Sequence, residues 1–427
     1  MSTVATSSTS LPGLRERSHP AHWNVWFLCS ILLLAFMLRL AWRVHQGGAD
    51  FWINGYSFFY DLGANLAGGK GLCIDGAGCA VRMPLYPSFL ALTALAGKNY
   101  LWIVVPQALM GLGTVFCAFL IGKELFSESV GLLASALTAF YPYYLVHDTA
   151  LQETGMFTFL TALSVFLLLR ARRSSNVAVW TAAGVALGAA VLTRQTLLLF
   201  SAGALAWIFL CGDGSWGRKL DRLVAIAAPL CMLVGLWVAR NYMTVGTHIV
   251  TSEFGRQLWN ANNPKTFSHY PNESIDRSAD EAFAALSLSE QQELDGISDE
   301  VVRSHWFESK ALDYIKAHRL DTIRAAGRKI LAGFSWSFNP VREPVVQWSY
   351  LVSYGPIAIL GILGMSLSGR QWKEHSLLYL LFLTFTAVTA VFWAHTSHRS
   401  YLDVYWIVFA AYVLNRAFSE GVRRLPA

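Results

Sequence analysis

Residues 49–95 read ADFWINGYSFFYDLGANLAGGKGLCIDGAGCAVRMPLYPSFLALTAL and follow directly after a strongly apolar segment. The stretch contains acidic residues, a glycine-rich turn at 68–71, and an arginine–proline segment at 82–87 that opens another apolar helix. A connection between two membrane spans can be short, whereas long ordered loops are usually functional. We therefore expect the functional residues of the chain to gather around this loop.

The composition predicts a membrane protein. Of the 427 residues, 54% are hydrophobic and only 14% are charged, whereas a soluble domain carries about 25% charged residues. Too few charged groups are present to cover a surface in water, so we predict an all-α polytopic membrane protein. The net charge of +6 does not indicate nucleic acid, because the basic residues lie mostly in short loops between apolar segments.

Ten apolar segments are long enough to cross a bilayer at about 1.5 Å rise per residue. They are residues 22–44, 99–122, 128–147, 150–170, 176–192, 195–212, 221–240, 348–367, 375–394 and 401–419. The first segment lacks the small-residue cleavage site of a secretory signal peptide, so we predict that it is retained as a membrane span. The segment 85–97 is too short to span and is expected at the interface or as a re-entrant helix.

The distribution of lysine and arginine predicts the orientation. With the N-terminus in the cytoplasm, the loops that follow the even-numbered spans lie inside. These loops carry the basic residues, as the positive-inside rule requires. Both termini are then cytoplasmic, and two long polar connections lie outside. We predict four parts: a disordered cytoplasmic tail (1–21), a transmembrane catalytic module (22–240, with outer loop 45–98), an extracytoplasmic helical region (241–347) and C-terminal transmembrane helices (348–420).

Three local features add to this outline. Ser289 and Ser298 precede acidic residues and are predicted to cap helices in the extracytoplasmic region. Cys73 and Cys79 both lie in the first outer loop and would form a disulfide if that loop faces an oxidising compartment. Whether they are bonded stays open at this point.

Several motifs occur in a fixed order along the chain. Tyr60-xxx-Ala64-Asn65-Leu66-Ala67-x-Gly69-Lys70-Gly71 precedes Arg82-x-Pro84-Leu85-Tyr86-Pro87, and the later motifs are Tyr141-Pro142 with Glu153, Leu192-Thr193-Arg194, Arg240-Asn241-Tyr242, Leu258-Trp259-x-x-Asn262-Asn263-Pro264 and His398-Arg399-x-Tyr401. Up to about residue 265 this order resembles the GT-C glycosyltransferases of the protein-mannosyltransferase and aminoarabinose-transferase type. The resemblance implies a GT-C fold and an enzyme that moves a sugar from a polyprenyl-phosphate carrier to an acceptor outside the cytoplasm.

The resemblance also implies a carboxylate base in the first outer loop. The usual acid stands about three residues before the tyrosine of the first motif, where this chain has Ser57. Asp50, nearest the membrane exit, is our first candidate for the base, and Asp61 is the second. Glu153 is expected to lie close to the first acid. For each acid the alternative is a helix cap or an interfacial carboxylate in water.

The donor phosphate requires cations, and arginine suits it because its planar fork donates two hydrogen bonds at once. The candidates are Arg82, Arg240, Arg194, Lys70 and Arg399. For each of these side chains the alternative is a structural role. The side chain would then either extend its charged end to the membrane surface or pair with an acid of an outer loop. The candidates for sugar or acceptor binding are Trp259, Asn262, Asn263, Tyr60 and Tyr86, although an Asn-Pro sequence is also an ordinary turn.

These observations predict an inverting glycosyltransferase at the outer face of a bacterial cell inner membrane, with a lipid, glycan or protein acceptor. A transporter or lipid flippase is the first alternative, but it would predict repeated halves and mid-membrane charges, and the sequence has no repeat and no convincing mid-span charge pair. The second alternative is a divergent, non-catalytic member of the family, because Ser57 stands where an acid is usual. No metal is assigned, and a divalent cation stays open as a cofactor.

Overall fold

The computed structural model describes residues 21–211, 215–393 and 395–423. The predicted tail lies outside this part of the chain except for its last residue. Every named element in the described residues is a helix, and one isolated bridge joins Ile74 to Gly78. The prediction of an all-α polytopic protein is therefore confirmed.

Six helices of the described residues are long and apolar enough to cross a membrane. They are α1 (Ala21–Ile53), α4 (Tyr100–Leu125), α7 (Thr154–Arg172), α10 (Trp216–Val245), α16 (Pro344–Leu367) and α17 (Trp372–Val391). Four further apolar helices are shorter, namely α3 (Leu85–Ala94), α5 (Glu128–Ala139), α8 (Val177–Thr193) and α9 (Leu198–Cys211) with the turn before it. Helices cross lipid because they satisfy their own backbone hydrogen bonds.

Two predicted spans differ from the observed helices. The predicted span 128–147 is broken, because α5 ends at Ala139 and α6 (Pro142–His147) starts anew after an extended Tyr141. Proline has no backbone N–H and disfavours helical geometry in the residue before it. The first helix runs to Ile53 rather than to residue 44, with a break at Gly47, whose φ of 79° favours glycine.

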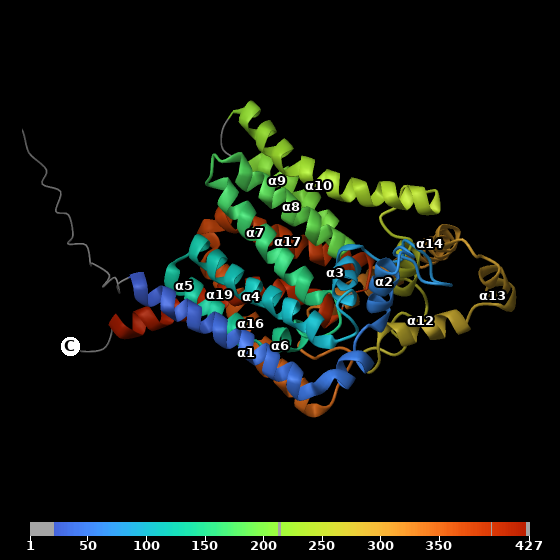
Figure 1. Cartoon of the computed structure of the whole chain (residues 1–427), viewed down its shortest axis with the longest axis horizontal. Coiled ribbons are helices and arrows are strands. Elements are labelled where there is room, and N and C mark those ends of the chain that lie inside the picture. The colour runs from blue at the N-terminus through green and yellow to red at the C-terminus, as the bar shows by residue number, and fades with distance from the viewer. Residues whose placement is uncertain (1–20, 212–214, 394, 424–427) are drawn as a thin grey trace, which may run out of the picture.

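The last helix, α19 (Asp403–Arg423), forms the centre of the bundle. Residues 401–411 are all buried, and α19 packs against α16, α5 and α4. By contrast, α1 and α10 lie on the outside of the bundle, where most of their apolar side chains face outward (Figure 1).

A second group of helices gathers at one end of the bundle. It comprises α2 (Ser57–Ala67), α11 (Phe254–Ala261), α12 (Ile275–Ala284), α13 (Leu288–Asp295), α14 (Glu300–Ala317), α15 (Arg319–Gly333) and α18 (Thr396–Arg399). In Figure 1, α12, α13 and α14 lie at the end opposite to the start of α1 and the end of α19. The two predicted serine caps are wrong by one or two residues, because Ser287 caps α13 in a capping box and Asp299 caps α14.

Candidate active site

An ion pair between Glu153 and Arg194 lies where several connections meet. Glu153 caps α7, and Arg194 follows α8 in extended conformation. The Arg194 Nε lies 2.8 Å from Glu153 Oε1, and Nη2 donates to Thr154 Oγ1 at 2.8 Å. The guanidinium also lies over the ring of Phe157 at 5.2 Å. Both charged side chains are mostly enclosed, with 14% and 16% of their surface exposed.

Three histidines lie close enough to Arg194 for its charge to lower the pKa of each. Burial, and after it the positive charge of Arg194, lower the pKa of His147 to about 3 and that of His395 to about 4. His398 stacks on His395 at 4.3 Å, and burial holds its pKa well below the usual range. The three imidazoles are therefore neutral near pH 7 and can accept as well as donate hydrogen bonds.

The first outer loop reaches the same place through Tyr56. Its backbone N–H donates to the carbonyl of Leu151 at 3.0 Å. Gly55 permits this approach, because a Cβ there would lie 2.6 Å from the Cβ of Leu151. Desolvation raises the pKa of Tyr56, and further shifts come from four charged neighbours. Glu153 and Asp276 raise it, whereas Arg194 and Arg342 lower it. Residues from four places therefore lie near this ion pair: the first outer loop, the connection before α7, the region 241–347 and the segment before α19.

The other two candidate acids lie in different surroundings. Asp50, near the end of α1, accepts from Arg43 Nη1 at 2.8 Å and from Asn54 Nδ2 at 2.6 Å, so both of its oxygens are engaged. Asp61 is exposed on α2 and makes no hydrogen bond or ion pair within the described part of the chain. Of the three, only Glu153 lies beside Arg194.

One of the candidate phosphate cations, Arg240, contacts the disulfide loop. Cys73 and Cys79 are bonded, which answers the question that the sequence left open. Arg240 donates to the carbonyl of Cys79 at 2.6 Å. Glu300 of α14 accepts from the backbone N–H of Cys79 at 2.6 Å and from that of Ala80 at 3.1 Å. Arg240 and Glu300 therefore hold one loop from two sides.

The remaining candidate cations lie elsewhere. Arg82 pairs with Glu253 at 3.3 Å and lies over the ring of Phe58. Lys70 is exposed in the glycine-rich turn. Arg399 is fully buried and pairs with Asp403 at 3.1 Å at the start of α19.

Comparison with known proteins supports the fold seen here. A sequence model of the family described as dolichyl-phosphate-mannose-protein mannosyltransferase matches residues 82–239. The crystal structure of the Archaeoglobus fulgidus oligosaccharyltransferase tethered with an acceptor peptide aligns with 94% of this chain, at a TM-score of 0.57 and 14% identity. The chain therefore contains a segment that matches this family, and it shares the fold of the archaeal oligosaccharyltransferase. It spans about half the length of that archaeal protein, since the match covers 50% of it.

Two further comparisons complete this result. The archaeal oligosaccharyltransferase AglB from Archaeoglobus fulgidus, in complex with an inhibitory peptide and a dolichol-phosphate, aligns with 93% of this chain and 51% of its own, at a TM-score of 0.56 and 14% identity. ArnT from Cupriavidus metallidurans bound to undecaprenyl phosphate aligns with 96% of this chain and 82% of its own, at 16% identity and a TM-score of only 0.38. No curated protein matches the sequence.

The candidate sugar-binding residues are mostly enclosed. Trp259 packs against Phe307 at 5.2 Å between α11 and α14. The amide groups of Asn262 and Asn263 donate to backbone carbonyls. Tyr60 packs edge-on against Trp52. Their contact with a sugar stays a prediction.

Tyr86, the fifth such candidate, supports the connection between α6 and α7. Its hydroxyl donates to Gln107 Oε1 at 3.1 Å. Gln107 Nε2 in turn donates to the carbonyl of Ala150 at 2.8 Å. The side chain of Tyr86 therefore links the Arg-x-Pro-Leu-Tyr-Pro motif to the loop that carries Glu153.

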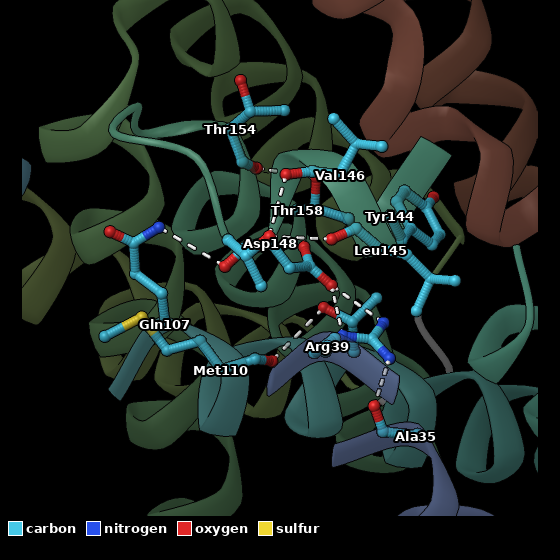
Figure 2. Close-up of polar contacts among 12 residues, drawn as sticks. Ala35, Arg39, Gln107, Met110, Tyr144, Leu145, Val146, Asp148, Thr154 and Thr158 are labelled. Carbon is cyan, nitrogen blue, oxygen red and sulfur yellow. Dashed lines mark hydrogen bonds and ion pairs between the residues drawn. The ribbon is translucent and has the colours of Figure 1, made fainter. Parts of the chain in front are cut away.

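A buried ion pair that sequence inspection did not identify fixes the same loop. Figure 2 shows Arg39 of α1 reaching Asp148, with Nη2 and Oδ2 2.8 Å apart and both side chains enclosed. Gly111 leaves room for the pair, since a Cβ there would lie 2.5 Å from Asp148 Oδ2. The expectation that no charge pair involves the middle of a span is thus wrong for Arg39. A charged residue inside an apolar segment was the available signal.

No group of three or more histidine, cysteine, aspartate or glutamate side chains in the described residues is arranged to hold a metal ion. His395 also lies near Arg194 and was not among the residues predicted from the sequence. It belongs to none of the motifs quoted above. Only the folding of its loop beside Arg194 identifies it.

Proposed function

We propose that this protein transfers a sugar from a polyprenyl-phosphate carrier to an acceptor hydroxyl on the outer side of a bacterial inner membrane, with inversion at the anomeric carbon. The observation that carries the proposal is the Glu153–Arg194 pair. It places a carboxylate and a guanidinium 2.8 Å apart where the outer connections of the GT-C fold meet. A base and a phosphate-binding cation are the two groups that this reaction requires.

The chemistry assigns one role to each partner. Glu153 takes the proton of the acceptor hydroxyl while that oxygen attacks the anomeric carbon of the sugar. The bond from this carbon to the phosphate oxygen breaks, and its electron pair leaves with the polyprenyl phosphate. Arg194 Nη1 makes no hydrogen bond among the described residues, so it is available to the departing phosphate. The neutral imidazoles of His147 and His395 can orient sugar hydroxyls.

A polyprenyl-phosphate donor is supported by what the similar proteins bind. The matching family is described by a dolichyl-phosphate-mannose donor, and the archaeal AglB structure contains dolichol-phosphate. The acceptor is proposed to be a lipid, a glycan or a protein. The termini are proposed to be cytoplasmic, because the start of α1 and the end of α19 lie at the end opposite to α12, α13 and α14.

The decisive experiment measures sugar transfer by purified protein from a panel of polyprenyl-phosphate sugars. We expect Glu153→Gln to lower turnover by at least about 100-fold, since general-base catalysis contributes about 10²–10⁴-fold. The matched control is Glu124→Gln, because Glu124 is similarly enclosed and pairs with Arg173 at 3.0 Å, outside the proposed centre. Full activity of Glu153→Gln, with loss in Asp50→Asn or Asp61→Asn, would move the base to the first outer loop.

A further inference from the structure

A cavity of about 470 Å³ lies within the outer helical region. Its walls are the turn 262–268, Tyr314 near the end of α14, and one side of α15. Three charged side chains line it: Asp321, Arg324 and Arg328. Neither Glu153 nor Arg194 is among the lining residues, so the cavity is distinct from the proposed catalytic centre.

The charges of the cavity do not balance. Arg324 Nη1 lies 3.2 Å from Asp321 Oδ1, so the one acidic side chain among the lining residues already has a basic partner. Arg328 makes no ion pair or hydrogen bond within the described residues, and its guanidinium lies over the ring of Phe267 at 3.9 Å. Stacking on an aromatic ring holds the flat guanidinium in place while its N–H donors stay uncommitted. The cavity therefore has one positioned cation without a partner.

A second basic side chain, Lys329, lies behind the residues that line the cavity. Lys329 is fully buried and donates to Asn262 Oδ1 at 3.2 Å and to the carbonyl of Val391 at 2.8 Å. No carboxylate contacts it in the described part of the protein, and burial lowers its pKa to about 8. Asn262 lines the cavity, so this uncompensated charge is one side chain away from the interior. A buried charge without a counter-ion is costly, and a nearby anion would offset that cost.

We infer that this cavity is a binding site for an anionic group of phosphate type. The planar fork of Arg328 matches the geometry of phosphate oxygens. The hydroxyl of Tyr314 makes no hydrogen bond in the described residues and provides a further donor on the wall. The buried Lys329 adds a positive potential. The inference does not depend on sugar transfer, because it concerns binding alone.

The phosphate has two sources that the chemistry of the cavity does not separate. One is a lipid headgroup, because α15 exposes Leu320, Ile323 and Leu331 beside the arginines, with exposures of 70%, 68% and 73%. The other is a soluble phosphate-bearing molecule entering from the aqueous side. The experiment below distinguishes them.

The test measures the thermal stability of the full-length protein in two settings. In phosphatidylcholine nanodiscs, inorganic phosphate is titrated against sodium chloride of equal ionic strength. In a parallel series, phosphatidylglycerol replaces part of the phosphatidylcholine. We expect one of these anions to raise Tm, and we expect Arg328→Gln to weaken its apparent affinity about tenfold, the loss of one charge-assisted hydrogen bond. The matched control Arg319→Gln lies on α15 outside the cavity and should leave the affinity unchanged.

Each outcome decides the proposal. Stabilisation by inorganic phosphate that depends on Arg328 supports the site and a soluble source. Stabilisation by phosphatidylglycerol alone, again dependent on Arg328, supports the site and a lipid source. No stabilisation by either, or equal losses in the Arg328→Gln and Arg319→Gln variants, overturns it. If Arg328→Gln does not fold, Arg328→Lys keeps the charge and removes the fork, and the same comparison applies.

Discussion

At the scale of single residues, the loop from His147 to Glu153 is held from several directions. Arg39 binds the carboxylate of Asp148, Gln107 binds the carbonyl of Ala150, and Tyr56 binds that of Leu151. Each contact comes from a different helix or loop. Groups fixed in this way keep a catalytic side chain in one geometry, which is what an efficient site needs.

The enclosed histidines predict a pH dependence of stability. His147 has an ordinary pKa of 6.5 when unfolded and a pKa of about 3 when folded. Below pH 6.5 the unfolded chain binds a proton that the folded chain does not, so stability falls on acidification and is constant above that pH. At about 1.4 kcal/mol per pH unit, the loss at pH 5 is about 2 kcal/mol.

The measurement is Tm between pH 7.5 and pH 5. We expect the Tm of His147→Gln to fall less steeply than that of the wild-type protein. His305→Gln, at an exposed position beside Glu308, should follow the wild-type curve. Parallel curves for all three proteins would show that His147 is not enclosed as described.

At the scale of elements, the disulfide loop and α14 form one unit. Glu300 accepts two backbone N–H groups of the loop, and Gly78 leaves the space that the carboxylate occupies. Arg240 of α10 binds the same loop through the carbonyl of Cys79. A charged residue of the outer region thereby fixes a loop about 220 residues earlier in the chain.

This arrangement predicts a local effect of Glu300→Gln. Replacing the carboxylate removes charge-assisted hydrogen bonds worth about 1.5–3 kcal/mol each. We expect hydrogen exchange at the amides of Cys79 and Ala80 to become at least about tenfold faster. Glu308→Gln, on the same helix, should leave these amides unchanged. Equal exchange in both variants would mean that α14 does not hold the loop.

At the scale of the whole molecule, the bundle separates two ends. The start of α1 and the end of α19 lie at one end, and α12, α13 and α14 lie at the other (Figure 1). The proposed centre joins the outer loops near the second end. The termini and the centre should therefore lie on opposite sides of the membrane.

Cysteine labelling in intact cells tests this orientation. In a background with Cys29, Cys117, Cys211 and Cys231 changed to serine, Leu288→Cys in α13 should react with a membrane-impermeant maleimide. Ser419→Cys near the end of α19 should react only after the membrane is made permeable. Both positions are exposed. Labelling with the reverse pattern would invert the proposed topology.

Sequence alone determined the class of protein and the approximate positions of its long apolar helices. The ten apolar segments follow from local composition, because lipid admits only a backbone that satisfies its own hydrogen bonds. Two segments differ from the observed helices: 22–44 continues to Ile53, and 128–147 breaks before Pro142 because proline disfavours helical geometry in the residue before it. Arg194 and Glu153 could be named because each lies in a motif.

Only the tertiary structure decided which charges meet. Arg39 and Asp148 are 109 positions apart, and Glu300 lies 221 positions from Cys79. Asp50 has both oxygens engaged, whereas Glu153 lies among the histidines, and nothing local distinguishes the two acids. Such pairings depend on how the helices pack and on which side chains packing removes from water. A pattern along the chain therefore predicts where a charge lies relative to the membrane, and the fold determines its partner.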